Sequence, residues 1–230
     1  AFGRKYSWPG HPGFVIGSLD KEVSVGSGIY GEDGWEKLGL DRKRHYYGAA
    51  FYRSEPSGKG HGVLLLLDDK NDGHAFKVDP TNWRNSYRGN LGPVVLLTTD
   101  PVTAYRSLAM QDADTLLASA DGMVIRFARD GRNWKETARF SGGDDPFGSQ
   151  IDIACDAGLL WVADTDNHRV LCFDAETWQP LAAYGTGTAG PALDQLNRPT
   201  TIQARGERCV LFDSGNQRLV KLNIQRRINE

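Results

Sequence analysis

The hydrophobic and polar positions of this chain alternate in short blocks that predict many short β-strands. Apolar runs end at Asp, Asn or Gly, a few small polar residues follow, and a new apolar run begins. The chain also contains 27 glycines and 10 prolines, which suit turns between short strands better than long helices. No stretch keeps the 3.6-residue period of a long amphipathic helix, so the pattern favours an all-β fold.

Two segments in the second half of the chain, 159–173 and 208–222, align without gaps. In each, an apolar strand ends at Asp, a short turn with Asn follows, and Arg opens a second apolar strand. The pattern predicts a hairpin, because Asp and Asn accept the free backbone donors of a tight turn and tolerate its left-handed positions. A leading strand is predicted before each hairpin, at 151–155 and 200–204. The matched polar positions lie 49 residues apart: Asp164 and Asp213, Asn167 and Asn216, Arg169 and Arg218.

Weaker copies of this unit lie upstream. One hairpin is predicted at 116–127 after a strand at 107–111, and another at 63–78 after a strand at 47–52. A tryptophan follows a polar turn at a similar phase of four units, which we interpret as packing between units. These tryptophans are Trp35, Trp83, Trp134 and Trp178.

A unit of up to four short strands in about 47 residues has the size of a propeller blade. We therefore predict an all-β fold, a β-propeller of four-stranded antiparallel blades that occupies the whole chain, 1–230, as a single domain. Five units are counted, and a sixth is left open because residues 1–60 diverge from the repeat. The predicted parts are a divergent first blade with a closing strand at 1–45, then blades at 46–92, 93–142, 143–190 and 191–230.

The segments 160–173 and 210–220 resemble the NHL repeat, whose signature is an apolar "VAD" strand followed by N-x-R-V/I and another apolar strand. Residues 196–199, Leu-Asn-Arg-Pro, resemble the lead-in to such a repeat. The resemblance implies a β-propeller, commonly six-bladed. It implies no single activity, because such propellers include protein-binding and RNA-binding modules, and related folds include lactonase-like hydrolases and an amidating lyase.

Charge and composition narrow the function classes. A net charge of −2, from 27 basic and 29 acidic residues, offers no basic stripe for a nucleic acid. The longest aliphatic run, 63–67, is far too short to span a membrane. The chain starts with Ala1, so we expect a processed or cut N-terminus and leave open that it is part of a larger chain or complex. The compartment stays open. Three cysteines in apolar runs, predicted to be buried free thiols, are Cys155, Cys172 and Cys209.

The repeated Asp, Asn and Arg are predicted to build the hairpin turns and to pair between blades, since a structural role explains their recurrence. Neighbouring carboxylates elsewhere are expected to face water, but Asp144 and Asp145 lie on a connection between blades, which normally lines one rim of the central channel. No catalytic residue or metal ligand is assigned and no cofactor is predicted. A divalent metal in the axial channel is left open, with the histidines as its candidate ligands: His11, His45, His61, His74 and His168.

The sequence therefore predicts a non-catalytic binding module whose inter-blade loop face holds a protein, a small ligand or a carbohydrate. Aromatic and Arg side chains near the starts of the innermost strands are the expected anchors. One alternative is a hydrolase or lyase with a divalent metal in the axial channel; another is a carbohydrate-binding propeller that uses the tryptophans for stacking. The predicted binding residues are Tyr46, Tyr47, Tyr105, Arg106, Asp144 and Asp145.

Overall fold

The structure is a computed structural model that describes residues 2–8, 11–17, 22–23, 46–53, 62–68, 72–78, 87–102 and 104–224. These residues form β-strands joined by turns and loops, with one 3-10 turn, η2 (Ser214–Asn216). The predicted tryptophan markers Trp35 and Trp83 lie outside the described residues. The strands are β1 (Phe2–Trp8), β2 (His11–Gly17), β3 (Glu22–Val23), β4 (Tyr46–Arg53), β5 (Gly62–Asp68), β6 (Gly73–Val78), β7 (Tyr87–Val94), β8 (Leu96–Leu97), β9 (Tyr105–Met110), β10 (Thr115–Ala120), β11 (Met123–Asp130), β12 (Asn133–Phe140), β13 (Ile151–Asp156), β14 (Leu159–Asp164), β15 (Arg169–Asp174), β16 (Pro180–Tyr184), β17 (Pro199–Arg205), β18 (Arg208–Asp213) and β19 (Arg218–Asn223).

Within the described residues the strands form separate sheets, and each sheet is a meander in which neighbouring strands along the chain pair antiparallel. Their orders are β1-β2-β3, β4-β5-β6-β7, β13-β14-β15-β16 and β17-β18-β19. The sheet β9-β10-β11-β12 carries an additional strand, because β8 pairs in parallel with the outer edge of β12. All-β architecture, predicted from the alternation of short apolar runs, is confirmed.

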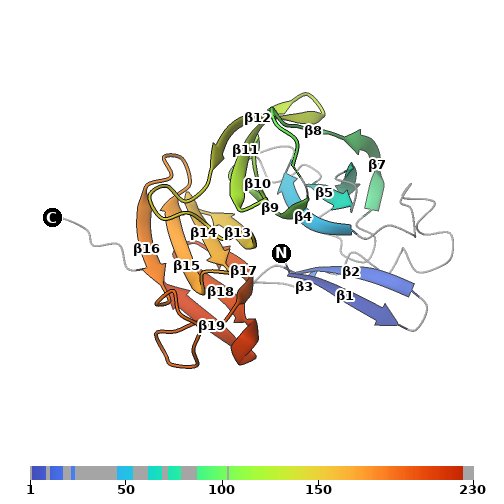
Figure 1. Cartoon of the computed structure of the whole chain (residues 1–230). Helices are drawn as coiled ribbons and strands as arrows, with labels where there is room; N and C mark the ends of the chain where they lie inside the picture. Colours follow the sequence, from blue (N-terminus) through green and yellow to red (C-terminus); the bar gives the residue numbers. More distant parts are fainter. Residues whose placement is uncertain are drawn as a thin grey trace.

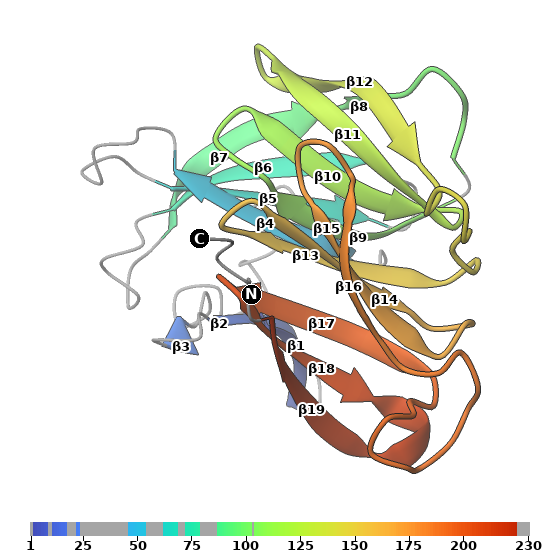
Figure 2. The ribbon, with the colours of Figure 1, turned by 90° about the vertical axis from the view of Figure 1, so that its left-hand side faces the viewer.

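The first strands of successive sheets lie side by side. β4 packs against β9, β9 against β13, and β13 against β17. Figure 1 shows the sheets following one another around a common centre, with these first strands innermost, and Figure 2 shows the same order from the side. This arrangement is that of a β-propeller, in which each sheet buries its faces against its neighbours.

Strand β14 shows why the apolar runs are nearly continuous. Its side chains alternate between two cores: Leu160 and Val162 pack toward the sheet of β9–β12, whereas Trp161 and Ala163 pack toward the sheet of β17–β19. Burying one such aliphatic or aromatic side chain contributes about 1.5–3 kcal/mol to folding. A third core of the same kind joins the sheet of β9–β12 to that of β4–β7.

The predicted hairpins are present as β14–β15 and β18–β19. In both turns the residue directly before the Arg has a left-handed backbone, His168 with φ 54° and Gln217 with φ 52°. The sequence analysis expected the repeated Asp and Asn at the left-handed positions of the turns, and this expectation is wrong. Their side chains instead form hydrogen bonds with the backbone of the connection that precedes the sheet, and these bonds hold the turn against that connection.

The three cysteines are free, as predicted. Cys172 and Cys209 are buried and Cys155 is half-buried. Burial raises the pKa of the Cys155 and Cys209 thiols to about 12, so neither is a ready nucleophile near neutral pH. In the part of the chain that the structure describes, no helix has the length and apolar character that crossing a membrane requires.

Candidate binding face

We call one side of the molecule the loop face. It carries the connections that lead into β13 and β17 (residues 141–150 and 185–198) and the hairpin turns after β14 and β18 (165–168 and 214–217). The turn of one sheet touches the end of the connection and the start of the next sheet: the Arg198 N–H donates to His168 Nδ1 at 3.1 Å, and Thr165 Oγ1 donates to the carbonyl of Pro199, the first residue of β17, at 2.6 Å. The loop face is thus a continuous layer of mutually bonded loops.

Asp164 organises the first part of this layer. Its buried carboxylate accepts hydrogen bonds from the Gly148 N–H (3.0 Å), Asn167 Nδ2 (2.9 Å) and Arg169 Nε (2.9 Å). Arg169 then reaches the incoming connection, where it pairs with the Asp145 carboxylate and donates to the Pro146 carbonyl at 3.0 Å. The carboxylate and guanidinium together fix where the chain enters β13.

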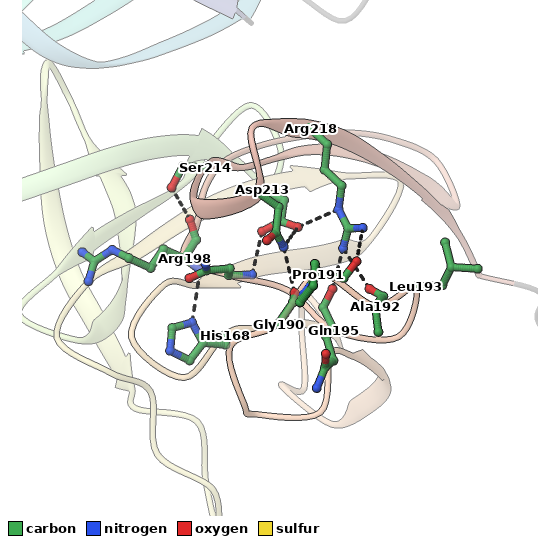
Figure 3. Close-up of polar contacts among 12 residues, drawn as sticks. His168, Gly190, Pro191, Ala192, Leu193, Gln195, Arg198, Asp213, Ser214 and Arg218 are labelled. Carbon is green, nitrogen blue, oxygen red and sulfur yellow. Dashed lines mark hydrogen bonds and ion pairs between the residues drawn. The ribbon is translucent and has the colours of Figure 1, made fainter.

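Asp213 builds the same unit in the last sheet (Figure 3). It accepts from the Asn197 N–H (2.6 Å), from Asn216 Nδ2 (2.7 Å) and from Arg218 Nε (2.8 Å). The Arg218 guanidinium holds three carbonyls of the preceding connection. These belong to Pro191 at 3.0 Å, Ala192 at 3.1 Å and Gln195 at 2.6 Å.

The repeated Asp, Asn and Arg therefore shape loops instead of meeting a ligand. The prediction that they build the turns is confirmed, with one refinement. Each Arg pairs with the Asp of its own hairpin and reaches the connection between sheets chiefly through backbone carbonyls. Since both Asp side chains are fully buried and their oxygens are occupied, they offer nothing to solvent.

Of the predicted binding residues whose side chains the structure describes, one is buried and the others are exposed. Tyr105 is 3% exposed and lies in the core between two sheets, so its ring does not reach the surface. The same burial raises the pKa of its hydroxyl to about 12. Arg106 is exposed at a break in the β9–β10 register, which leaves it without a cross-strand partner residue. Tyr46 and Tyr47 begin β4, and the structure describes only their backbone.

Asp144 and Asp145 are both exposed on the connection to β13. The Asp145 side chain is 75% exposed although it pairs with Arg169, so one face of the carboxylate remains open to solvent. Arg106 stands at the start of the neighbouring inner strand β9. The loop face therefore presents basic and acidic side chains from adjacent sheets on a fixed backbone.

The sequence pattern did not predict a chain of polar contacts that joins β9 and β10 to the first strand of the next sheet, β13. Ser119 Oγ and Ser107 Oγ are 2.8 Å apart, Ser119 Oγ donates to the Ile151 carbonyl, and the Ile153 N–H donates to Ser107 Oγ. Beyond these, the Ile202 N–H donates to Asp152 Oδ2 at 2.8 Å. Burial raises the pKa of Asp152 to about 6, and its hydrogen bonds act in the opposite direction. The trace of this network in the sequence is the presence of Ser107 and Ser119 within otherwise apolar strands.

Side chains that the sequence offered for metal binding, acid–base catalysis or carbohydrate stacking make structural contacts instead. His168 accepts a backbone hydrogen bond, and Asp112 Oδ1 accepts from the Asp114 N–H, which closes a local turn. Trp134 is buried, and Trp178 stacks on Phe140. Among the described ranges, no three His, Cys, Asp or Glu side chains are grouped as a metal ion would require. His45 and His61 lie outside those ranges.

Comparison with known proteins agrees with this geometry. Residues 151–173, from β13 into β15, match the NHL repeat. This segment is therefore an NHL repeat, as its residue pattern predicted. Among curated protein sequences, none matches the chain.

Several solved structures are similar in fold. A protein of unknown function from Bacteroides caccae matches with a TM-score of 0.50 and 13% identity, over 92% of this chain and 71% of that one. The β-propeller domain of Cps50 (Swd1) from Myceliophteria thermophila matches with a TM-score of 0.48 and 11% identity, over 93% and 64%. A glutaminyl cyclase of Myxococcus xanthus matches with a TM-score of 0.40 and 10% identity, over 73% and 64%. At these identities the likeness concerns the fold alone, and the chain covers less than two thirds of the cyclase and of the Cps50 domain.

Proposed function

We propose that this chain is a non-catalytic binding module that holds a protein or a small ligand on its loop face. The observation that carries the proposal is the fixation of this face. Two Asp–Arg pairs with buried carboxylates fasten the connections before β13 and β17, while charged side chains beside them stay exposed. A surface that is already ordered loses little conformational entropy when a partner binds, so its contacts translate into affinity.

The proposal includes the finer architecture. The five sheets are taken as five blades of one propeller domain over residues 1–230, with the first blade and the closing strand supplied by residues 1–45. The side-by-side packing of β4, β9, β13 and β17 supports this interpretation, because the first strand of each blade lines the propeller axis. A sixth blade would need a further sheet beyond those of the described residues.

Arg106 and Asp144 are the residues proposed to meet the partner, with Asp145 beside them. Asp145 has a second task, since it pairs with Arg169, so its replacement would mix a binding effect with a structural one. Arg106 and Asp144 are exposed and can be replaced alone. The partner class remains a protein or small ligand, and a nucleic acid is disfavoured by the net charge of −2.

The test compares charge-reversal variants on the two sides of the molecule. Arg106→Glu and Asp144→Lys should weaken partner binding, measured by quantitative co-purification and then by titration with the identified partner. The matched control is Arg132→Glu, an exposed Arg in the β11–β12 turn on the opposite side. Equal melting temperatures would show that all three variants fold.

If both loop-face variants bind the partner as tightly as the unmodified chain, the loop face is not the binding surface. If only Arg132→Glu weakens binding, the opposite face takes the partner. Either result would overturn the proposal without affecting the fold.

A further inference from the structure

His168 joins two loops of the loop face through a hydrogen bond that only a neutral imidazole can make. It is the last residue of the turn after β14, and its Nδ1 accepts the Arg198 N–H at 3.1 Å (Figure 3). An imidazole nitrogen accepts a hydrogen bond only while it carries no proton. Histidine is the side chain that ordinarily titrates between about pH 5 and 8. This contact between the turn and the connection to β17 therefore depends on pH.

Both partners of this bond have left-handed backbones, with φ 54° at His168 and φ 55° at Arg198. Neither residue is a glycine, and such conformations persist only where the surrounding structure fixes them. Arg198 is fixed at both of its backbone polar groups. His168 accepts from its N–H, and the Ser214 N–H and Oγ donate to its carbonyl at 3.3 and 2.6 Å. Losing the His168 bond removes one of these two restraints where the chain enters β17.

The repeat does not require an imidazole at this position. In the last sheet, 49 residues later, Gln217 takes the same left-handed position before the Arg that opens the second hairpin strand. The loop face as defined above contains one histidine, which is His168. Its place in the turn therefore departs from the repeat and gives this junction a titratable acceptor.

Charged side chains around the bond act in both directions. The Asp166 carboxylate on the same turn favours an imidazolium, but it already accepts from Ser149 Oγ at 2.7 Å and from the Gln150 N–H at 3.0 Å. The Arg198 guanidinium opposes an imidazolium. In the described part of the chain, the imidazole has no hydrogen bond or ion pair besides the one with the Arg198 N–H, so its protonation acts on that bond. The other charged residues on the turn and on the connections that contact it are Asp144, Asp145, Asp164, Arg169 and Asp194.

We propose that His168 is a pH-sensitive latch of the loop face. Near neutral pH the ring proton lies on Nε2, Nδ1 accepts the Arg198 N–H, and the turn holds the connection to β17. In mild acid Nδ1 takes up a proton, two donors then face each other, and the connection is released. The bond therefore stabilises this face while His168 is neutral and is lost as the pH falls through its titration. A partner held by the loop face would bind less tightly in mild acid, a step that rests on the proposed function.

The test measures hydrogen exchange of the Arg198 amide in the full chain by NMR at about pH 7.5 and about pH 5. Rates are expressed as protection factors, which removes the intrinsic pH dependence of exchange. The protection factor should fall about fivefold or more in acid, as expected for the loss of one hydrogen bond.

His168→Asn is the matched variant, because asparagine tolerates a left-handed backbone and its Oδ1 accepts an N–H without titrating. In this variant the protection factor should be the same at both pH values. His74→Gln removes a histidine from β6, in another sheet, and should leave the acid loss unchanged.

The nitrogen chemical shifts of the His168 ring test the unmodified chain directly, and near neutral pH they should identify the Nε2–H tautomer. A proton on Nδ1 near neutral pH overturns the latch. So does a protection factor that does not change with pH, or an acid loss that persists in His168→Asn.

The link to binding is tested with the partner identified by co-purification. Its affinity should fall in acid for the unmodified chain and stay constant for His168→Asn. If the Arg198 amide responds to pH and the affinity does not, His168 does not regulate binding. A partner that ignores both Arg106→Glu and Asp144→Lys contradicts the proposed function instead, and the latch is then judged by the exchange data alone.

Discussion

At the scale of single residues, one buried carboxylate serves three donors in each hairpin. Asp164 accepts from Gly148, Asn167 and Arg169. We expect Asp164→Ala to lower the free energy of unfolding by about 3 kcal/mol or more, because it leaves the buried Arg169 guanidinium without this partner. Denaturant unfolding measures the change. Asp144→Ala, at an exposed position of the same face, should stay within about 0.5 kcal/mol of the unmodified chain.

Asp152 gives a pH dependence of stability. Burial raises its folded pKa to about 6, above the usual value of 3.8, so the folded state favours the protonated carboxyl. Its contribution to stability is therefore full below pH 3.8 and is lost as the pH rises through 6. Asp152→Asn keeps an acceptor for the Ile202 N–H without the charge. The melting temperature of this variant should rise relative to the unmodified chain between pH 4 and 7, and a constant difference across that range would refute the assignment.

The predicted binding residues show what the sequence could not decide at this scale. Tyr105, Arg106 and Asp144 are polar or aromatic residues near predicted strand starts, and the pattern does not tell which of them is buried. Tyr105 is buried because the sheets before and after β9 cover both faces of that strand. Arg106 is exposed because the β9–β10 register breaks beside it. Both outcomes depend on packing between sheets, which a local pattern does not contain.

At the scale of elements, the hairpins could be predicted because their determinants are local. The Asp, the Asn and the Arg of each turn lie within a few residues of one another, and their spacing is the same in β14–β15 and β18–β19. The connections could not be predicted in the same way. Arg169 binds the Pro146 carbonyl, and Arg218 binds the Gln195 carbonyl at the equivalent position. Between the preceding strand and this position, the connection to β13 has five residues, 141–145, and the connection to β17 has ten, 185–194. The added residues carry Leu193, which departs from the repeat and is the most exposed large apolar side chain described.

Arg218 should control the order of that longer loop. A lysine at this position keeps the charge but cannot reach three carbonyls and the Asp213 carboxylate at once. In Arg218→Lys we expect faster hydrogen exchange at the amides of Gly190 and Gln195, whose N–H groups bond within the loop, with little change in melting temperature. Arg198→Lys is the control, because the Arg198 side chain is exposed. Unchanged exchange in Arg218→Lys would mean that the loop holds its shape without the clamp.

At the scale of the whole molecule, the repeat explains which surfaces should be covered. In the sheet of β13–β16, Ala163 and Val170 are buried beneath the next sheet. The equivalent positions of the last sheet, 49 residues later, are Phe212 and Leu219, and both are exposed. A closed ring would place the first sheet against this side of the last one. The proposed closure by residues 1–45 can therefore be tested at Phe212.

Deleting residues 1–23, which carry β1 to β3, should lower the melting temperature by about 3 °C or more if the first sheet packs against the last. A cysteine introduced as Phe212→Cys should then react faster with a thiol reagent in the shortened chain than in the full one, because Phe212 is only 39% exposed in the full chain and would lose the rest of its cover. Leu193→Cys, on the loop face, should react at the same rate in both. Of the native thiols, Cys172 and Cys209 are buried and Cys155 is half-buried, so the rates are compared with those of the chains without an introduced cysteine. If the deletion changes neither the melting temperature nor the labelling rate at position 212, the first sheet does not close the ring. The last sheet would then present its Phe212 side as an open surface of the propeller.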